Sequence, residues 1–63
     1  MIDDSRDVLF EFTVIGSAVR VAAIDARSGL EVTVMGPASA ARADLQRLAL
    51  RKLEARLAAG AKP

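Results

Sequence analysis

The apolar pattern begins with a stretch that has the two-residue period of a β-strand. Every second residue from Val8 to Ile15 falls on one face, and one of the two faces is entirely apolar. Gly16-Ser17 follows where a two-residue hairpin loop belongs, and Gly in the first central position suits a type II′ turn. This turn predicts the pairs Val14/Val19, Phe12/Val21, Phe10/Ala23, Leu9/Ile24, Glu11/Ala22 and Thr13/Arg20.

A second turn and a third strand follow. The segment from Asp25 to Gly29 offers an Asp that can bond its own backbone and a Gly that can take positive φ. A four-residue loop there pairs Ala23 with Val32 and Val21 with Val34. The third strand is predicted from Leu30 to Met35, ending at Gly36-Pro37.

The remaining third of the chain predicts one helix. Residues 40–59 are rich in strong helix formers. Pro37 suits a first helical turn, Ser39 is the candidate N-cap, and Gly60 fits the C′ position. The fold class is therefore α+β: a three-stranded antiparallel meander in the order 1-2-3, with one C-terminal helix packed on the Val/Phe face as a second layer. We expect a single domain over residues 1–63, with residues 1–6 and 61–63 frayed.

The apolar arc of this helix is wider than one sheet face can cover. At about 100° per residue it spans about 200°, whereas packing on one surface needs little more than about 100°. Lys52 and Arg56 fall inside the arc and divide it into two seams. One seam, predicted to sit on the sheet, contains Leu45, Leu48 and Ala49. The other, predicted to form a dimer interface, contains Leu50, Leu53 and Leu57.

Two further surfaces lack a partner in a single copy of this fold. Both outer strands leave an open edge, which invites pairing with another chain. The sheet face away from the helix is also about half apolar. The sequence does not decide between helix-mediated and edge-strand dimerisation, nor whether the helix is exchanged between subunits at a hinge formed by Gly36-Pro37-Ala38.

Composition points to oligomerisation and away from chemistry. A chain of 63 residues without Cys or His cannot use disulfides, and small folds of this size otherwise rely on a metal or on oligomerisation. No His is present to activate a serine, and no Gly-rich loop precedes a helix to hold phosphate. We expect no catalytic residues, no cofactor and no metal, and thus no enzyme. No signal peptide or membrane span is visible, so a soluble, cytoplasmic protein is expected.

The net charge of +1 hides an acidic first half and a basic helix. Possible contacts to nucleic acid or to an acidic partner are Arg47, Arg51, Lys52 and Arg56. The alternative is that these charges complement the acidic half of the same fold or dimer. The open sheet face has no aromatic residue, which makes nucleic acid the less favoured partner.

Several runs resemble a family of short uncharacterised alphaproteobacterial proteins. The resemblance covers roughly residues 8–57 and is carried by residues 19–32, Gly36-Pro37 and residues 48–54. Relatives sometimes bear the label serine hydroxymethyltransferase. That chemistry needs a large pyridoxal-phosphate enzyme, and no cofactor-binding lysine or phosphate site is matched here, so the label is a misassignment. The family implies no known activity and transfers no site residues.

Taken together, these patterns predict a small non-enzymatic homodimer that serves as an interaction or adaptor protein. The alternatives are a weak nucleic-acid-binding module that uses the basic helix, and an accessory subunit of a larger enzyme. The sequence does not name a biological partner, pathway or ligand.

Overall fold

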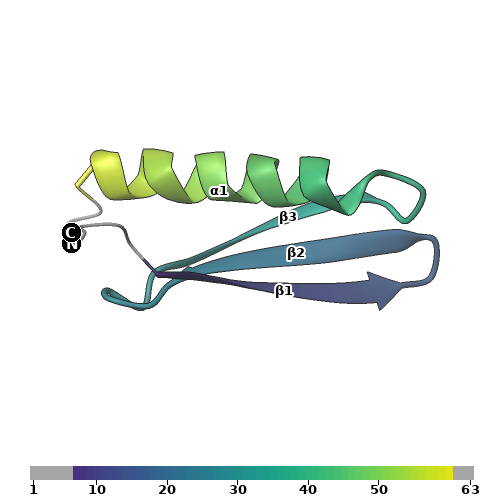
Figure 1. Cartoon of the computed structure of the whole chain (residues 1–63), viewed down its shortest axis with the longest axis horizontal. Helices are drawn as coiled ribbons and strands as arrows, with labels where there is room; N and C mark the ends of the chain where they lie inside the picture. The colour runs from purple at the N-terminus through teal and green to yellow at the C-terminus, as the bar shows by residue number, and fades with distance from the viewer. Residues whose placement is uncertain (1–6, 61–63) are drawn as a thin grey trace.

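Three antiparallel strands and one C-terminal helix make up the described part of the chain. The computed structural model describes residues 7–60, so the expected fraying of residues 1–6 and 61–63 lies outside the described residues. Strands β1 (Val8–Ile15), β2 (Ala18–Asp25) and β3 (Glu31–Pro37) form one sheet in the order β1-β2-β3, and helix α1 (Arg42–Ala58) follows. The helix runs along one face of this sheet (Figure 1). The predicted α+β meander is confirmed.

The register of the first hairpin follows from its short loop. Gly16 has a φ of 62°, the positive value that a primed two-residue turn requires at this position. Starting from the closing pair Ile15/Ala18, the ladder continues without a bulge to Val8/Asp25. All six predicted pairs are confirmed: Val14/Val19, Phe12/Val21, Phe10/Ala23, Leu9/Ile24, Glu11/Ala22 and Thr13/Arg20.

Asp25 organises the second turn. Its side chain is only 2% exposed, and Oδ2 accepts hydrogen bonds from the backbone N–H of Ser28 at 3.0 Å and from its hydroxyl at 2.7 Å. The Ser28 hydroxyl oxygen in turn accepts a bond from the N–H of Leu30 at 3.1 Å. Gly29 has a φ of 80°. These roles agree with the sequence prediction, as do the pairs Ala23/Val32 and Val21/Val34.

The connection from β3 to α1 differs from its prediction. Strand β3 does not stop at Met35 but continues through Pro37, which pairs with Ala18. Beyond it, the N–H of Ala38 donates to the carbonyl of Ser17 at 2.8 Å. Pro37 therefore ends the strand and is not part of the first helical turn.

The helix start also differs, because these bonds hold the chain to the sheet for longer than expected. Ser39 is not the N-cap. That position belongs to Ala41, which makes no side-chain capping bond. At the other end the prediction is confirmed, since Gly60 has a φ of 89° and donates its N–H to the carbonyl of Leu57 at 3.0 Å.

The core lies between α1 and the strands β2 and β3. Helix α1 packs chiefly on these two strands and reaches β1 less. Gly36 allows the close approach, because a Cβ at this position would lie 2.5 Å from Cδ2 of Leu45. The buried core residues are Val19, Val21, Ala23, Val32, Leu45, Ala49 and Leu53.

The predicted division of the helix into two seams is wrong. Leu53 is 0% exposed and Leu57 packs against the core, whereas Leu48, expected on the sheet, is 48% exposed. The side chain of Lys52 extends to the edge of β3. Lys52 therefore lies beside the buried residues of the helix and does not separate them into two groups. While α1 packs on its own sheet, Leu53 is not available to a second chain.

Candidate interaction surfaces

The direction of the backbone groups on both sheet edges follows from bonds at the strand ends. The N–H of Ala26 donates to the carbonyl of Asp7 at 2.9 Å, so Asp7 faces β2. Backbone direction alternates along an antiparallel strand. The residues of β1 whose N–H and C=O point away from the sheet are therefore Val8, Phe10, Phe12 and Val14.

The same alternation applies to β3. The N–H of Asp25 donates to the carbonyl of Leu30 at 2.8 Å, and that of Ala38 to the carbonyl of Ser17 at 2.8 Å. Both ends of β3 are thus fixed relative to β2. The residues of β3 whose backbone groups point outward are Glu31, Thr33, Met35 and Pro37.

The outer edge of β3 is partly blocked. Lys52 Nζ donates to the outward carbonyl of Thr33 at 2.8 Å. Pro37 has no N–H to offer, and its carbonyl accepts the N–H of Ala40 at 2.9 Å. Lysine and proline on an edge are recurring protections against pairing with another chain. Strand β3 is therefore a poor template for an added strand.

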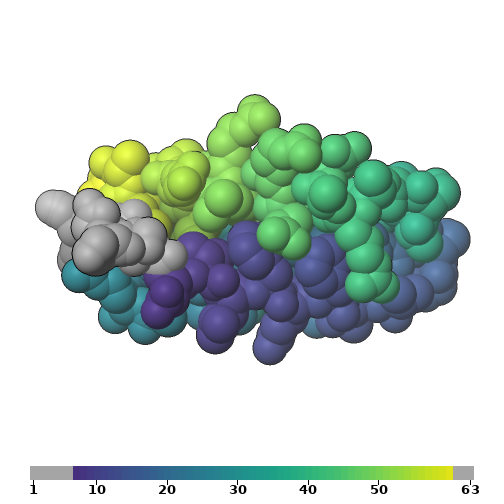
Figure 2. Space-filling view, viewed as in Figure 1, coloured from purple at the N-terminus to yellow at the C-terminus, as the bar shows by residue number. Residues whose placement is uncertain are grey.

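The outer edge of β1 has none of these protections. Within residues 7–60, no hydrogen bond reaches the outward groups of Val8, Phe10, Phe12 or Val14. The strand contains neither Lys nor Pro. No described element lies in front of β1 in the view of Figure 2, where α1 borders it on one side. An eight-residue strand of this kind can accept another strand along its length.

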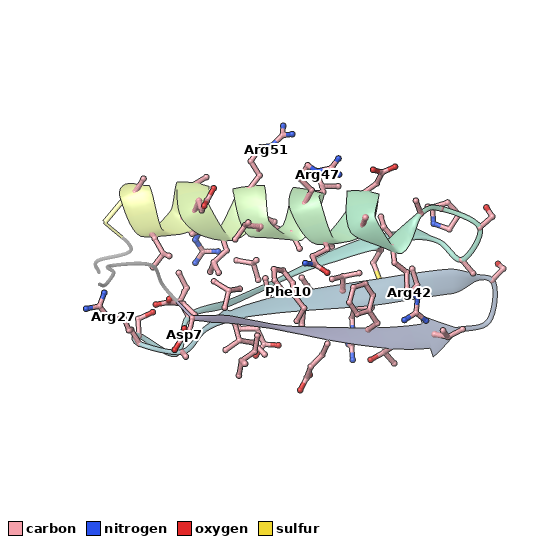
Figure 3. The ribbon with its side chains drawn as sticks, viewed as in Figure 1. Asp7, Phe10, Arg27, Arg42, Arg47 and Arg51 are labelled. Carbon is pink, nitrogen blue, oxygen red and sulfur yellow. The ribbon has the colours of Figure 1, made fainter. Side chains whose placement is uncertain are left out.

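The helix flank beside β1 is apolar with a basic start. The guanidinium carbon of Arg42 lies 5.0 Å from the centroid of the Phe12 ring, which places Arg42 on the β1 side of the helix (Figure 3). Residues at helical spacing share that side, namely Gln46, Leu50 and Leu57. Leu50 and Leu57 are both partly buried. Together with partly buried Phe12, this flank forms an incompletely covered apolar surface next to the open edge.

The sheet face away from α1 carries large apolar side chains in solvent. Leu9 is 58%, Ile15 51% and Met35 57% exposed. The charged groups on this face are Glu11, Arg20 and Glu31. In the part of the chain that the structure describes, Arg20 makes no ion pair with either acid. This face therefore combines unpartnered apolar surface with unpaired charges of both signs.

The basic residues proposed for nucleic acid or an acidic partner do not converge on one face. Arg47 and Arg51 point away from the sheet (Figure 3), and Arg47 pairs with Asp44 at 3.2 Å. Lys52 is bonded to the β3 edge. Arg56 is exposed on the last turn of α1. Arg47 and Arg51 thus share the side of α1 away from the sheet, and Lys52 does not join them there.

Among residues 7–60, a depression on α1 is a weak candidate for a small-ligand site. A surface depression of about 270 Å³ lies on α1 against Ala43, Gln46, Arg47 and Leu50, and its lining comes from one helix only. Ligand pockets usually enclose about 300–1,000 Å³ and draw on several elements. Among residues 7–60, no cluster of acidic side chains has the arrangement of a metal site, and no helix there has the length and apolarity to cross a membrane.

The sequence did not distinguish the two sheet edges. It contained two residues that protect β3, namely Pro37 at the end of the strand and Lys52 in the apolar arc of the helix. This protection could be recognised only from the direction of each backbone group in the structure.

Comparison with other proteins places the chain in a family. No curated protein and no solved structure matches it. Residues 5–60 match the family described as a domain of unknown function, DUF6898. This match covers nearly the whole chain, and the protein therefore belongs to the DUF6898 family.

Proposed function

We propose that this protein is a non-enzymatic homodimeric interaction module, in which the β1 edges of two copies pair. The observation that carries the proposal is the difference between the edges. Lys52 and Pro37 protect β3, while the outward groups of β1 have no partner within residues 7–60. Pairing two copies of β1 would satisfy these groups and join the two sheets into one.

A two-fold axis perpendicular to the sheet would run the two β1 strands antiparallel. Any centre on a residue of β1 keeps outward residues opposite outward residues, and centres on Glu11 and Phe12 pair the most of the strand. Centring on Glu11 places two carboxylates face to face, which is unfavourable. Centring on Phe10 pairs fewer residues and sets Leu9 against the partner's Glu11. Centring on Phe12 sets Leu9 against the partner's Ile15 and Glu11 against the partner's Thr13, so this register is favoured.

The same pairing would cover apolar groups on the helix side of the sheet. Val14, which is 60% exposed, comes to lie opposite the partner's Phe10. The helix flank with Leu50 and Leu57 borders the added strand. These two residues of the predicted interface thus contribute to the proposed dimer, whereas Leu53 supports α1 from within.

The proposed dimer does not require an exchanged helix. The predicted hinge is tied to the sheet, because Pro37 is the last residue of β3 and Ala38 bonds to Ser17. Gly36 lies under Leu45. A swapped helix would have to break these contacts first, so we propose that each helix stays on its own sheet.

Nucleic-acid binding is the weaker alternative. Arg47 and Lys52 already have partners in the chain, and the four basic side chains do not share a face. Binding to nucleic acid releases counterions, so it weakens steeply with added salt. Retention on immobilised DNA that falls with ionic strength would favour this alternative. An accessory role in a larger enzyme would be favoured by stoichiometric co-purification with that enzyme.

Proline substitution at outward edge positions tests the dimer. Val14→Pro removes an outward N–H of β1, and the matched control Met35→Pro removes one of β3. Neither change removes a bond of the existing ladder. Size exclusion with light scattering should give a monomer for Val14→Pro and retain paired chains in the wild type and in Met35→Pro. Circular dichroism confirms folding. An unchanged mass for folded Val14→Pro would overturn edge pairing.

A further inference from the structure

We propose that two edge-paired dimers stack through the sheet faces opposite their helices, so that the protein forms a tetramer of identical chains. This inference rests on the proposed edge pairing. The partner proposed for this sheet face is a second copy of the same six-stranded layer. The proposal is supported by the unpartnered apolar surface of the face, its unpaired charges and the size of the joined face.

The apolar groups on this face lie where a second sheet can meet them. Leu9 and Ile15 stand near opposite ends of β1, and Met35 lies on β3. All three are more than half exposed in the single chain. Two sheets packed back to back with antiparallel strands, centred at Phe12, place Leu9 opposite Ile15 of the other layer. Each apolar end of the face then meets an apolar end.

The charges on the face fit the same arrangement. Arg20 and Ala22 of β2 both face away from α1, on either side of Val21, which pairs with Phe12. A centre at Phe12 therefore sets Arg20 opposite Ala22 of the other layer. Packed sheets lie about 10 Å apart, which requires small residues opposite large ones. Ala22 is small, and its cross-strand neighbour is Glu11. Arg20, which is unpaired within its own described chain, thereby reaches a carboxylate of the other layer.

The area of the face explains why stacking depends on edge pairing. With a strand spacing of about 4.8 Å and a rise of about 3.3 Å per residue, a three-stranded face covers about 380 Å². Two such faces bury about 760 Å² in total, below the range of about 1,200–2,000 Å² for stable interfaces. A joined six-stranded face doubles the total to about 1,500 Å². The edge dimer is thus the unit that can stack.

Sedimentation equilibrium of the wild type and two variants tests the stacking. Met35→Lys places a charge on the sheet face away from α1, on a strand that takes no part in the proposed edge pairing. Leu48→Lys, the matched control, makes the same change at a half-exposed position on the helix. We expect tetramers for the wild type and Leu48→Lys at high protein concentration. Met35→Lys should weaken tetramer formation at least about tenfold and leave a dimer.

The outcomes separate this inference from the proposed function. A wild type that stays dimeric at all concentrations, or a Met35→Lys variant that remains as tetrameric as the wild type, would overturn stacking. Either result leaves edge pairing standing if Val14→Pro is monomeric. A folded Val14→Pro variant that still forms dimers, which Met35→Lys then dissociates, would show that face packing occurs without edge pairing and would overturn the proposed function.

Discussion

The two edges of this sheet belong to strands of similar length and similar apolarity, yet they differ in what they can accept. Strand β3 ends at a proline and has a lysine bonded to its outward Thr33 carbonyl. Strand β1 has eight residues, and the outward backbone groups of four of them have no partner among the described residues. What an edge strand can accept therefore depends on its outward N–H and C=O groups more than on the side chains of the strand.

The position of α1 causes this difference. Gly36 lets the helix approach β3 closely through Leu45, and Lys52 then reaches over the edge of the same strand. The helix therefore completes one side of the molecule. The other side, with Phe12 and Val14, is left for another chain.

Removing the buried side chain that holds α1 on the sheet should have the largest effect on the stability of the protein. Leu53→Ala deletes a fully buried side chain and should lower the free energy of unfolding by about 2–5 kcal/mol. Urea unfolding at fixed protein concentration measures it. The control Leu48→Ala should cost less than about 1 kcal/mol, because Leu48 is half exposed. Equal losses for the two variants would contradict the assigned helix phase.

A methyl group at Gly36 should push α1 away from β3. Gly36→Ala should lower the free energy of unfolding by about 1–2 kcal/mol, because crowding against Leu45 exceeds the gain from a stiffer unfolded chain. Thermal unfolding measures the change. Ser39→Ala serves as the control and should be nearly neutral, because Ser39 does not cap the helix. A stable Gly36→Ala variant would show that the close contact with β3 is dispensable.

The register of the strands could be predicted from the sequence, but the orientation of α1 on the sheet could not. The strands and their register were predictable, because a two-residue loop at Gly16-Ser17 and an apolar alternation fix pairing locally. The phase of α1 was not, because the long side chain of Lys52 carries its amine from the helix to the carbonyl of Thr33 at the edge of β3. A helical wheel treats such a residue as an interruption of the apolar arc.

The start of the helix was mispredicted for a related reason. Ser39 has the chemistry of an N-cap, but the chain before the helix is held by bonds from Ala38 to Ser17 and from Ala40 to Pro37. The first of these joins residues far apart in sequence. The candidate surfaces were recognisable as unsatisfied from the sequence, but ranking them required the backbone directions.

A charge on the helix flank beside β1 should weaken the dimer less than loss of the edge itself. Leu50→Glu should reduce the association constant about tenfold, because it desolvates a carboxylate next to the added strand. Analytical ultracentrifugation over a dilution series measures the constant. The control Leu48→Glu makes the same change on the opposite flank and should leave dimerisation intact. Identical association constants for the two variants would remove Leu50 from the interface.

Removing the lysine at the β3 edge should have the smallest effect on stability. Lys52→Met should change the free energy of unfolding by less than about 1 kcal/mol, because the bond to Thr33 is exposed. It should nevertheless open the outward carbonyl and increase self-association through β3. Light scattering against concentration detects this, with Arg51→Met as a charge-matched control. Equal scattering from the two variants would show that Lys52 does not protect the edge.

Residue-resolved amide hydrogen exchange, measured by NMR at several protein concentrations, distinguishes pairing through β1 from pairing through β3. The outward N–H groups of Phe10, Phe12 and Val14 should be protected at high concentration and exchange rapidly on dilution. Those of Glu31 and Met35 on β3 should exchange rapidly throughout. Concentration-independent, rapid exchange along the outward positions of β1, or concentration-dependent protection on β3 alone, would contradict the assignment of β1 as the pairing edge.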